Sequence, residues 1–158
     1  EVLLDAVSLT LEVPTAFHGG PGEFPLGTRA IELPDENVAI AFLDVFGRPA
    51  RFKACECERI DTPTLAQGLE LVNSNQIQSK LSSQTGFTHR LAVNNRSPQE
   101  NCELIFLTLY GRAGTAAELE VAVAHVSGSD AADESDKIER YRNLIWALLA
   151  SNEFMFVQ

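Results

Sequence analysis

Residues 97–118, SPQENCELIFLTLYGRAGTAAE, decide the fold class of this chain. They contain two capping boxes, Ser97-Pro-Gln-Glu100 with proline at the first helical position, and Thr115-Ala-Ala-Glu118. Between them, the stretch Leu104–Tyr110 is nearly all apolar, which predicts a central helix. Only a few residues, beginning at Gly111, separate the first helix from the second. This short connection predicts an antiparallel helical hairpin.

The chain before this stretch predicts helices separated by long loops. Residues 1–12 have apolar positions close to helical spacing. Residues 14–28 contain three prolines and four glycines, which predicts an irregular loop. Residues 29–33 alternate and predict a short extended segment, and residues 38–46 predict a short apolar helix.

The remaining segments complete a mainly α prediction. Pro63 is suited to the first position of a further helix, whereas the polar residues 82–96 predict a loop around a short turn. The last helix has one apolar face, formed by Ile138, Tyr141, Ile145, Leu148 and Leu149. We therefore expect an irregular multi-helix domain with an antiparallel hairpin, a C-terminal packing helix and long N-terminal loops.

The length and net charge of the chain indicate how many domains it forms and which partners are unfavourable. A chain of 158 residues suits a single domain, residues 1–158. Its net charge of −10 repels phosphate backbones, so nucleic acid and anionic membranes are poor partners. No apolar run in the sequence is long enough to span a bilayer. Because the first residue is not methionine and the first segment already looks helical, we interpret the chain as a fragment or mature part of a longer protein.

A dense block of charge and cysteine follows the 38–46 segment. It reads Phe46-Gly-Arg-Pro-Ala-Arg-Phe-Lys-Ala-Cys-Glu-Cys-Glu-Arg59. Five of its charged side chains are our candidate binding residues: Arg48, Arg51, Glu56, Glu58 and Arg59. Arginine forks suit carboxylates and other anions, so the block predicts either buried ion pairs that hold this segment to the helices or a site for an anionic ligand.

The three cysteines leave two alternatives open. Cys55 and Cys57 are too close in sequence for an unstrained disulfide, whereas Cys102 could bridge to one of them or remain a buried thiol. Cys55 and Cys57 are also the candidate thiolate ligands for a metal, but three or four converging ligands are needed and the histidines are scattered singly. The spacing C-x-C without a following histidine does not fit covalent haem. We expect no metal and no cofactor in this chain.

Motifs along nearly the whole chain resemble a planctomycete-specific domain of unknown function. The most specific are the cysteine–glutamate–arginine block, which matches at residues 46–49 and 55–59, and the segment Trp146–Leu149 within the matching residues 144–154. The other matching pieces are residues 1–7, 27–31, 64–67, 71–73, 109–112 with Thr115, and 118–119. That domain usually forms the C-terminal part of large proteins that also carry planctomycete cytochrome c-type domains. The chain resembles the C-terminal portion of the domain, which implies that it is the C-terminal part of a larger protein.

The resemblance implies an extracytoplasmic setting, either periplasmic or at the cell surface, and a parent protein whose haem lies in another domain. Its partners would be other domains or subunits of that parent. Two functions remain open at this stage. The chain is a structural or interaction module of a cytochrome-linked protein, or it contributes to an active site or an anion- or carbohydrate-binding site that missing N-terminal domains complete.

Overall fold

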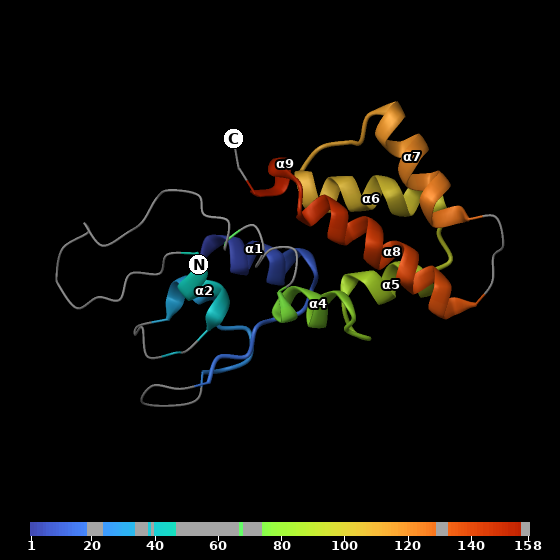
Figure 1. Cartoon of the computed structure of the whole chain (residues 1–158). Helices are drawn as coiled ribbons and strands as arrows, with labels where there is room; N and C mark the ends of the chain where they lie inside the picture. Colours follow the sequence, from blue (N-terminus) through green and yellow to red (C-terminus); the bar gives the residue numbers. More distant parts are fainter. Residues whose placement is uncertain are drawn as a thin grey trace. The chain divides into compact units, whose positions relative to one another are not determined.

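A computed structural model describes residues 1–18, 24–33, 38, 40–46, 67, 74–128 and 133–155 (Figure 1). These residues are mainly helical and contain no strand, which confirms the mainly α prediction. The chain divides into two compact units. The first comprises residues Glu1–Leu9 and Pro14–Gln78, and the second comprises Thr10–Val13 and Ser79–Gln158. The expected single domain stays a prediction.

The first unit contains three short helical elements. They are α1 (Val2–Thr10, whose last residue belongs to the second unit), the 3-10 helix η1 (Ala30–Glu32) and α2 (Ala41–Val45). The helix α4 (Asn75–Leu81) crosses the boundary between the two units in sequence. α2 is shorter than the predicted helix at 38–46. It buries Phe42 and Leu43, and Phe42 stacks on Phe46 with ring centroids 4.6 Å apart.

The prediction of an extended segment at residues 29–33 is wrong, because a long-range contact bends it into η1. The carboxylate of Asp5 accepts hydrogen bonds from the backbone N–H groups of Ala30 (2.6 Å) and Ile31 (3.1 Å). The side chain of Glu32 accepts from the backbone N–H of Arg29 (3.0 Å) and pairs with its guanidinium. These acceptors satisfy N–H groups that are left free at a helix start.

Asp5→Ala is expected to destabilise the first unit by about 1–2 kcal/mol, the usual cost of losing a helix cap. The reason is that the N–H of the buried Ala30 loses its acceptor. Urea unfolding measures the effect. The matched control is Asp133→Ala, since Asp133 also precedes a helix but makes no side-chain cap bond. Equal losses in both variants would contradict the role given to Asp5.

Among the described residues, the second unit contains the three longest helices and two shorter ones. They are α5 (Phe87–Val93), α6 (Pro98–Tyr110), α7 (Ala116–Ser127), α8 (Glu134–Leu149) and α9 (Asn152–Met155). α8 contacts α5, α6 and α7, and α6 also contacts α7 (Figure 1). Both predicted capping boxes are present, with Ser97 and Thr115 as the capping residues. Whether α6 and α7 form the expected antiparallel hairpin stays a prediction.

The prediction of a loop at residues 82–96 is wrong, because α5 lies within it. Phe87 and Leu91, spaced four residues apart, are both 1% exposed. The N–H of Phe87 donates to the carbonyl of Leu11 (2.9 Å). Gly86 precedes the helix and offers no capping side chain, so the sequence shows no start signal.

Candidate functional site

The candidate residues of the charged block lie outside the described residues. These are Arg48, Arg51, Cys55, Glu56, Cys57, Glu58 and Arg59. Their assignment as buried ion pairs or as an anion site stays a prediction. Among the described residues, Glu153 pairs with Arg112.

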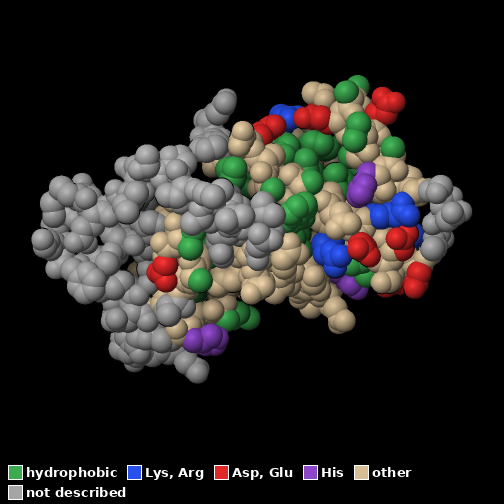
Figure 2. Space-filling view, in the orientation of Figure 1, with side chains coloured by type: hydrophobic (Ala, Val, Ile, Leu, Met, Phe, Trp, Pro, Cys, Tyr) green, Lys and Arg blue, Asp and Glu red, His purple; other side chains and the backbone are tan. Residues whose placement is uncertain are grey.

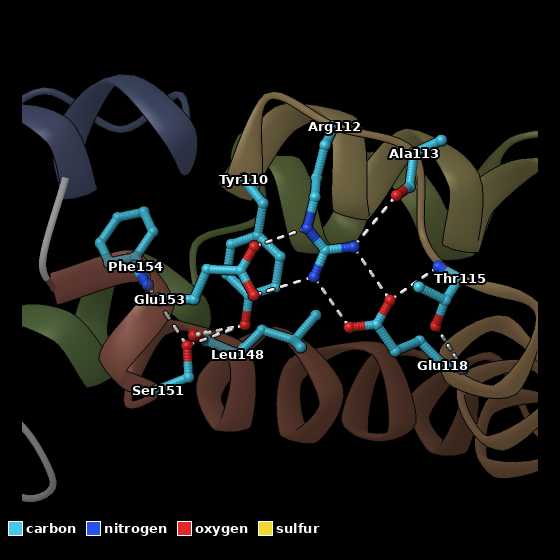
Figure 3. Close-up of polar contacts among 9 residues, drawn as sticks. All are labelled: Tyr110, Arg112, Ala113, Thr115, Glu118, Leu148, Ser151, Glu153 and Phe154. Atoms are coloured by element: carbon cyan, nitrogen blue, oxygen red, sulfur yellow. Dashed lines mark hydrogen bonds and ion pairs between the residues drawn. The ribbon is translucent and has the colours of Figure 1, made fainter. Parts of the chain in front are cut away.

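A cluster around Arg112 is the densest polar site that the structure describes (Figure 3). Its Nε and Nη2 atoms donate to the two carboxylate oxygens of Glu153, at 2.6 and 2.8 Å. Its Nη1 and Nη2 atoms donate to the two carboxylate oxygens of Glu118, at 2.9 and 2.8 Å. A further Nη1 bond reaches the carbonyl of Ala113 at 3.0 Å. An arginine side chain has five N–H donors, so all of them are used inside the chain.

The folding of the turn after α6 brings this cluster together. Gly111 ends α6 in the left-handed region, with φ of 66°, and directs the chain toward α7. Glu118 is also the carboxylate of the second capping box and accepts from the N–H of Thr115 at 2.6 Å. One carboxylate therefore both starts α7 and holds Arg112, while Glu153 attaches α9 to the same guanidinium.

The charges of the cluster stabilise one another. Hydrogen bonds from Arg112, followed by the backbone N–H of Thr115, lower the pKa of Glu118 to about 2. Arg112 likewise lowers the pKa of Glu153, and the two glutamates raise the pKa of Arg112. All three groups are therefore charged at neutral pH. Two carboxylates and one guanidinium give the cluster a net charge of −2 + 1 = −1, which does not favour a bound anion.

Tyr110 and Ser151 extend the cluster toward the end of α8. The hydroxyl of Tyr110 lies 2.8 Å from Oγ of Ser151 and donates to the carbonyl of Leu148 at 3.2 Å. Ser151 Oγ also accepts from the N–H of Phe154 (3.3 Å), at the start of α9. Burial raises the pKa of Tyr110, which makes it a poor general base. The arrangement joins helix ends and presents no activated nucleophile.

A second polar network is buried between α5, α6 and α8. Asn101 is 2% exposed, and its Nδ2 lies within hydrogen-bond distance of the carbonyl of Leu91 (3.1 Å) and the hydroxyl of Tyr141 (3.0 Å). The side-chain amides of Asn101 and Asn94 also face each other, at 2.9 and 3.2 Å. One asparagine therefore connects three helices in the second unit.

Lys80 is a buried amine near the end of α4. It is 5% exposed, and its Nζ donates to the carbonyl of Val13 at 2.6 Å. Beside Val13, Glu12 has a φ of 59° and forms an ion pair with Arg90. Burial lowers the pKa of Lys80 from 10.5 to about 8. Its charge therefore costs stability at neutral pH.

The titration of Lys80 predicts a specific pH dependence. Because the folded pKa is below the unfolded one, the folded state binds fewer protons between about pH 8 and 10.5, and the free energy of unfolding rises across this window. The slope from one proton is at most about 1.4 kcal/mol per pH unit. Lys80→Met is expected to remove this rise, whereas Lys137→Met, at an exposed site, leaves it intact.

Unfolding measured from pH 7 to 9.5 for both variants checks this prediction. Because the pKa of Cys102 is raised by folding, its titration lowers the free energy of unfolding above about pH 9. The quantity compared is therefore the difference in this free energy between wild type and variant. A difference between wild type and Lys80→Met that stays constant with pH would contradict the burial of the charged amine.

The described residues do not assemble metal ligands. No group of three or more histidine, cysteine, aspartate or glutamate side chains converges among them. Cys102 is a buried free thiol rather than a disulfide. Burial, with a smaller effect of Glu103, raises its pKa to about 11, so it stays protonated and unreactive.

Sequence reasoning did not assign a role to Asp5, Lys80, Asn101 or Arg112. The spacing of the capping box did contain a signal for Arg112, because Glu118 must lie next to the turn in which Arg112 sits. The other partners are distant in sequence, up to 67 residues for Lys80 and Val13.

Comparison of the chain with protein-family models, curated proteins and solved structures finds no match. Among the helices in the described ranges, none combines the length and apolar character needed to cross a membrane.

Proposed function

We propose that this chain is a structural and interaction module of a larger, extracytoplasmic, cytochrome-linked protein. The observation that carries the structural part is the saturation of Arg112 by Glu118, Glu153 and the Ala113 carbonyl. An arginine that binds a ligand needs free N–H donors, and this one has none. The role of the Arg112 cluster in this proposal is therefore to stabilise the fold.

The other polar groups support the same interpretation. Asn101 connects three helices through buried hydrogen bonds, and Lys80 holds the carbonyl of Val13. Each of these side chains contacts a group from a distant part of the chain. They are arranged to fix the positions of helices, which is what a module that presents surfaces to a partner requires.

The expected setting follows from the motifs that resemble the planctomycete domain. In this proposal the partners are other domains or subunits of the parent protein, and any haem is carried there. The chain itself needs no cofactor. Its net charge of −10 disfavours nucleic acid as a partner.

Cross-linking through carboxylates in the source cell tests the proposal. A carboxyl-reactive reagent suits an acidic chain, which has 22 aspartate and glutamate residues against 12 lysine and arginine residues. We expect cross-links from this chain to another domain or subunit of the parent, recovered from an extracytoplasmic fraction. Cross-links confined to the chain itself, or recovery from the cytoplasm, would contradict it.

A further inference from the structure

α7 carries apolar side chains on both of its sides, although only one side is covered. Its sequence is AAELEVAVAHVS. Ala122 and Val126 are buried on the inner face, toward α6 and α8. On the opposite face, Ala117, Val121 and Ala124 are exposed, and Val121 is 71% exposed. The exposed side of a surface helix is normally polar, whereas three of these exposed positions are apolar.

We name Ala117, Glu120, Val121 and Ala124 the outer face of α7. These positions recur at helical spacing and so share one side of the helix. Figure 2 shows hydrophobic side chains exposed over α6 and α7, with carboxylates near them. Among the described residues, no cover for this face is present, since Val121 is largely exposed.

The charges carried by α6, α7 and the turn between them indicate what would cover this face. Residues 97–128 contain four glutamates, Glu100, Glu103, Glu118 and Glu120, against the single arginine Arg112. Glu118, Glu153 and the Ala113 carbonyl use all the N–H donors of that arginine, so it attracts no further anion. Exposed charge on α6 and α7 is therefore acidic, which attracts a basic partner and repels a second copy of this acidic chain.

We propose that the outer face of α7 is the docking surface for a basic amphipathic helix of another polypeptide. The apolar side of that helix would cover Val121 and its alanine neighbours, and its lysines or arginines would lie beside Glu120. Small side chains at Ala117 and Ala124 let a helix backbone approach closely. The inference rests on the proposed role as an interaction module and specifies its surface and the chemistry of its partner.

Peptide binding tests this surface. The probe is a fluorescent Leu/Lys peptide of about 18 residues with amphipathic helical spacing, long enough to form a helix. The comparison peptide has the same composition in scrambled order. We expect the amphipathic peptide to bind the full 158-residue chain at least about tenfold more tightly than the scrambled one, because only it presents a continuous apolar face.

Matched variants locate the binding. Val121→Ser is expected to weaken binding of the amphipathic peptide by about tenfold, whereas Val93→Ser, at a valine 47% exposed on α5, leaves it unchanged. Glu120→Gln is expected to weaken binding at low salt, unlike Glu134→Gln at an exposed site on α8. Circular dichroism of each variant confirms that the helices remain.

Three results from the binding experiments would overturn the docking surface, and one cross-linking result would as well. They are equal binding of the two peptides, equal effects of Val121→Ser and Val93→Ser, and a concentration-dependent dimer that Val121→Ser abolishes. The last result would assign the face to a second copy of the chain. Cross-links from the chain to a parent domain that do not involve α7 would refute this surface while supporting the proposed function.

Discussion

Replacing Asn101 by leucine is expected to destabilise the second unit by about 3–5 kcal/mol. Leucine is similar in size but makes no hydrogen bond, so the carbonyl of Leu91, the hydroxyl of Tyr141 and the amide of Asn94 each lose a partner. Each unsatisfied buried group costs about 1–3 kcal/mol. The loss is a large part of a typical domain stability of about 5–15 kcal/mol. Urea unfolding followed by circular dichroism measures it.

The matched control for Asn101→Leu is Asn143→Leu. Asn143 is exposed on α8, so its replacement is expected to change stability by no more than about 0.5 kcal/mol. Similar losses in the two variants would show that the buried network does not hold α5, α6 and α8 together.

Gly114→Val is expected to cost about 3 kcal/mol or more, and Gly114→Ala at least about 1 kcal/mol. A Cβ atom at this position would lie 2.8 Å from Cδ2 of Phe106 and 3.1 Å from the Leu119 side chain. Phe106 is 3% exposed, so its ring has little room to move. The added atoms would push the turn that carries Arg112 away from α6.

Gly111 separates this steric effect from backbone strain. A Cβ at Gly111 meets nothing within 4 Å, but its φ of 66° is left-handed. Asparagine tolerates that region better than alanine does, so Gly111→Asn is expected to be more stable than Gly111→Ala. At Gly114 asparagine should give no such advantage, because the obstacle is space. Thermal unfolding of the alanine and asparagine variants at Gly111 and at Gly114 distinguishes the two causes. A Gly114→Asn variant more stable than Gly114→Ala would contradict the steric explanation.

The predictable parts of this structure are those encoded by neighbouring residues. Both capping boxes follow from residues three positions apart, and they placed the starts of α6 and α7 correctly. η1 could not be predicted, because Asp5 caps it from 25 residues away. α5 was missed since Gly86 provides no capping side chain, although Phe87 and Leu91 have helical spacing.

The polar clusters could not be predicted from the sequence, because their partners are also distant along the chain. Arg112 has one partner six residues away and another 41 residues away, and only packing of the helices brings Glu153 to it. Conversely, the most conspicuous block in the sequence, from Arg48 to Arg59, lies outside the described residues, so its role stays a prediction. The density of charge in the sequence led us to predict a site in that block. The polar site that the structure describes, around Arg112, is instead built from residues at three helix ends.

Carboxyl footprinting of the full-length parent protein tests the central claim most directly. A carbodiimide modifies exposed carboxylates, and Glu120 and Glu134 are both exposed in this chain. If α7 docks a partner helix, Glu120 in the assembled parent is modified several-fold more slowly than Glu134, and Val121→Ser removes the difference. Equal modification of Glu120 and Glu134 in the intact parent would contradict an interaction module that works through this face.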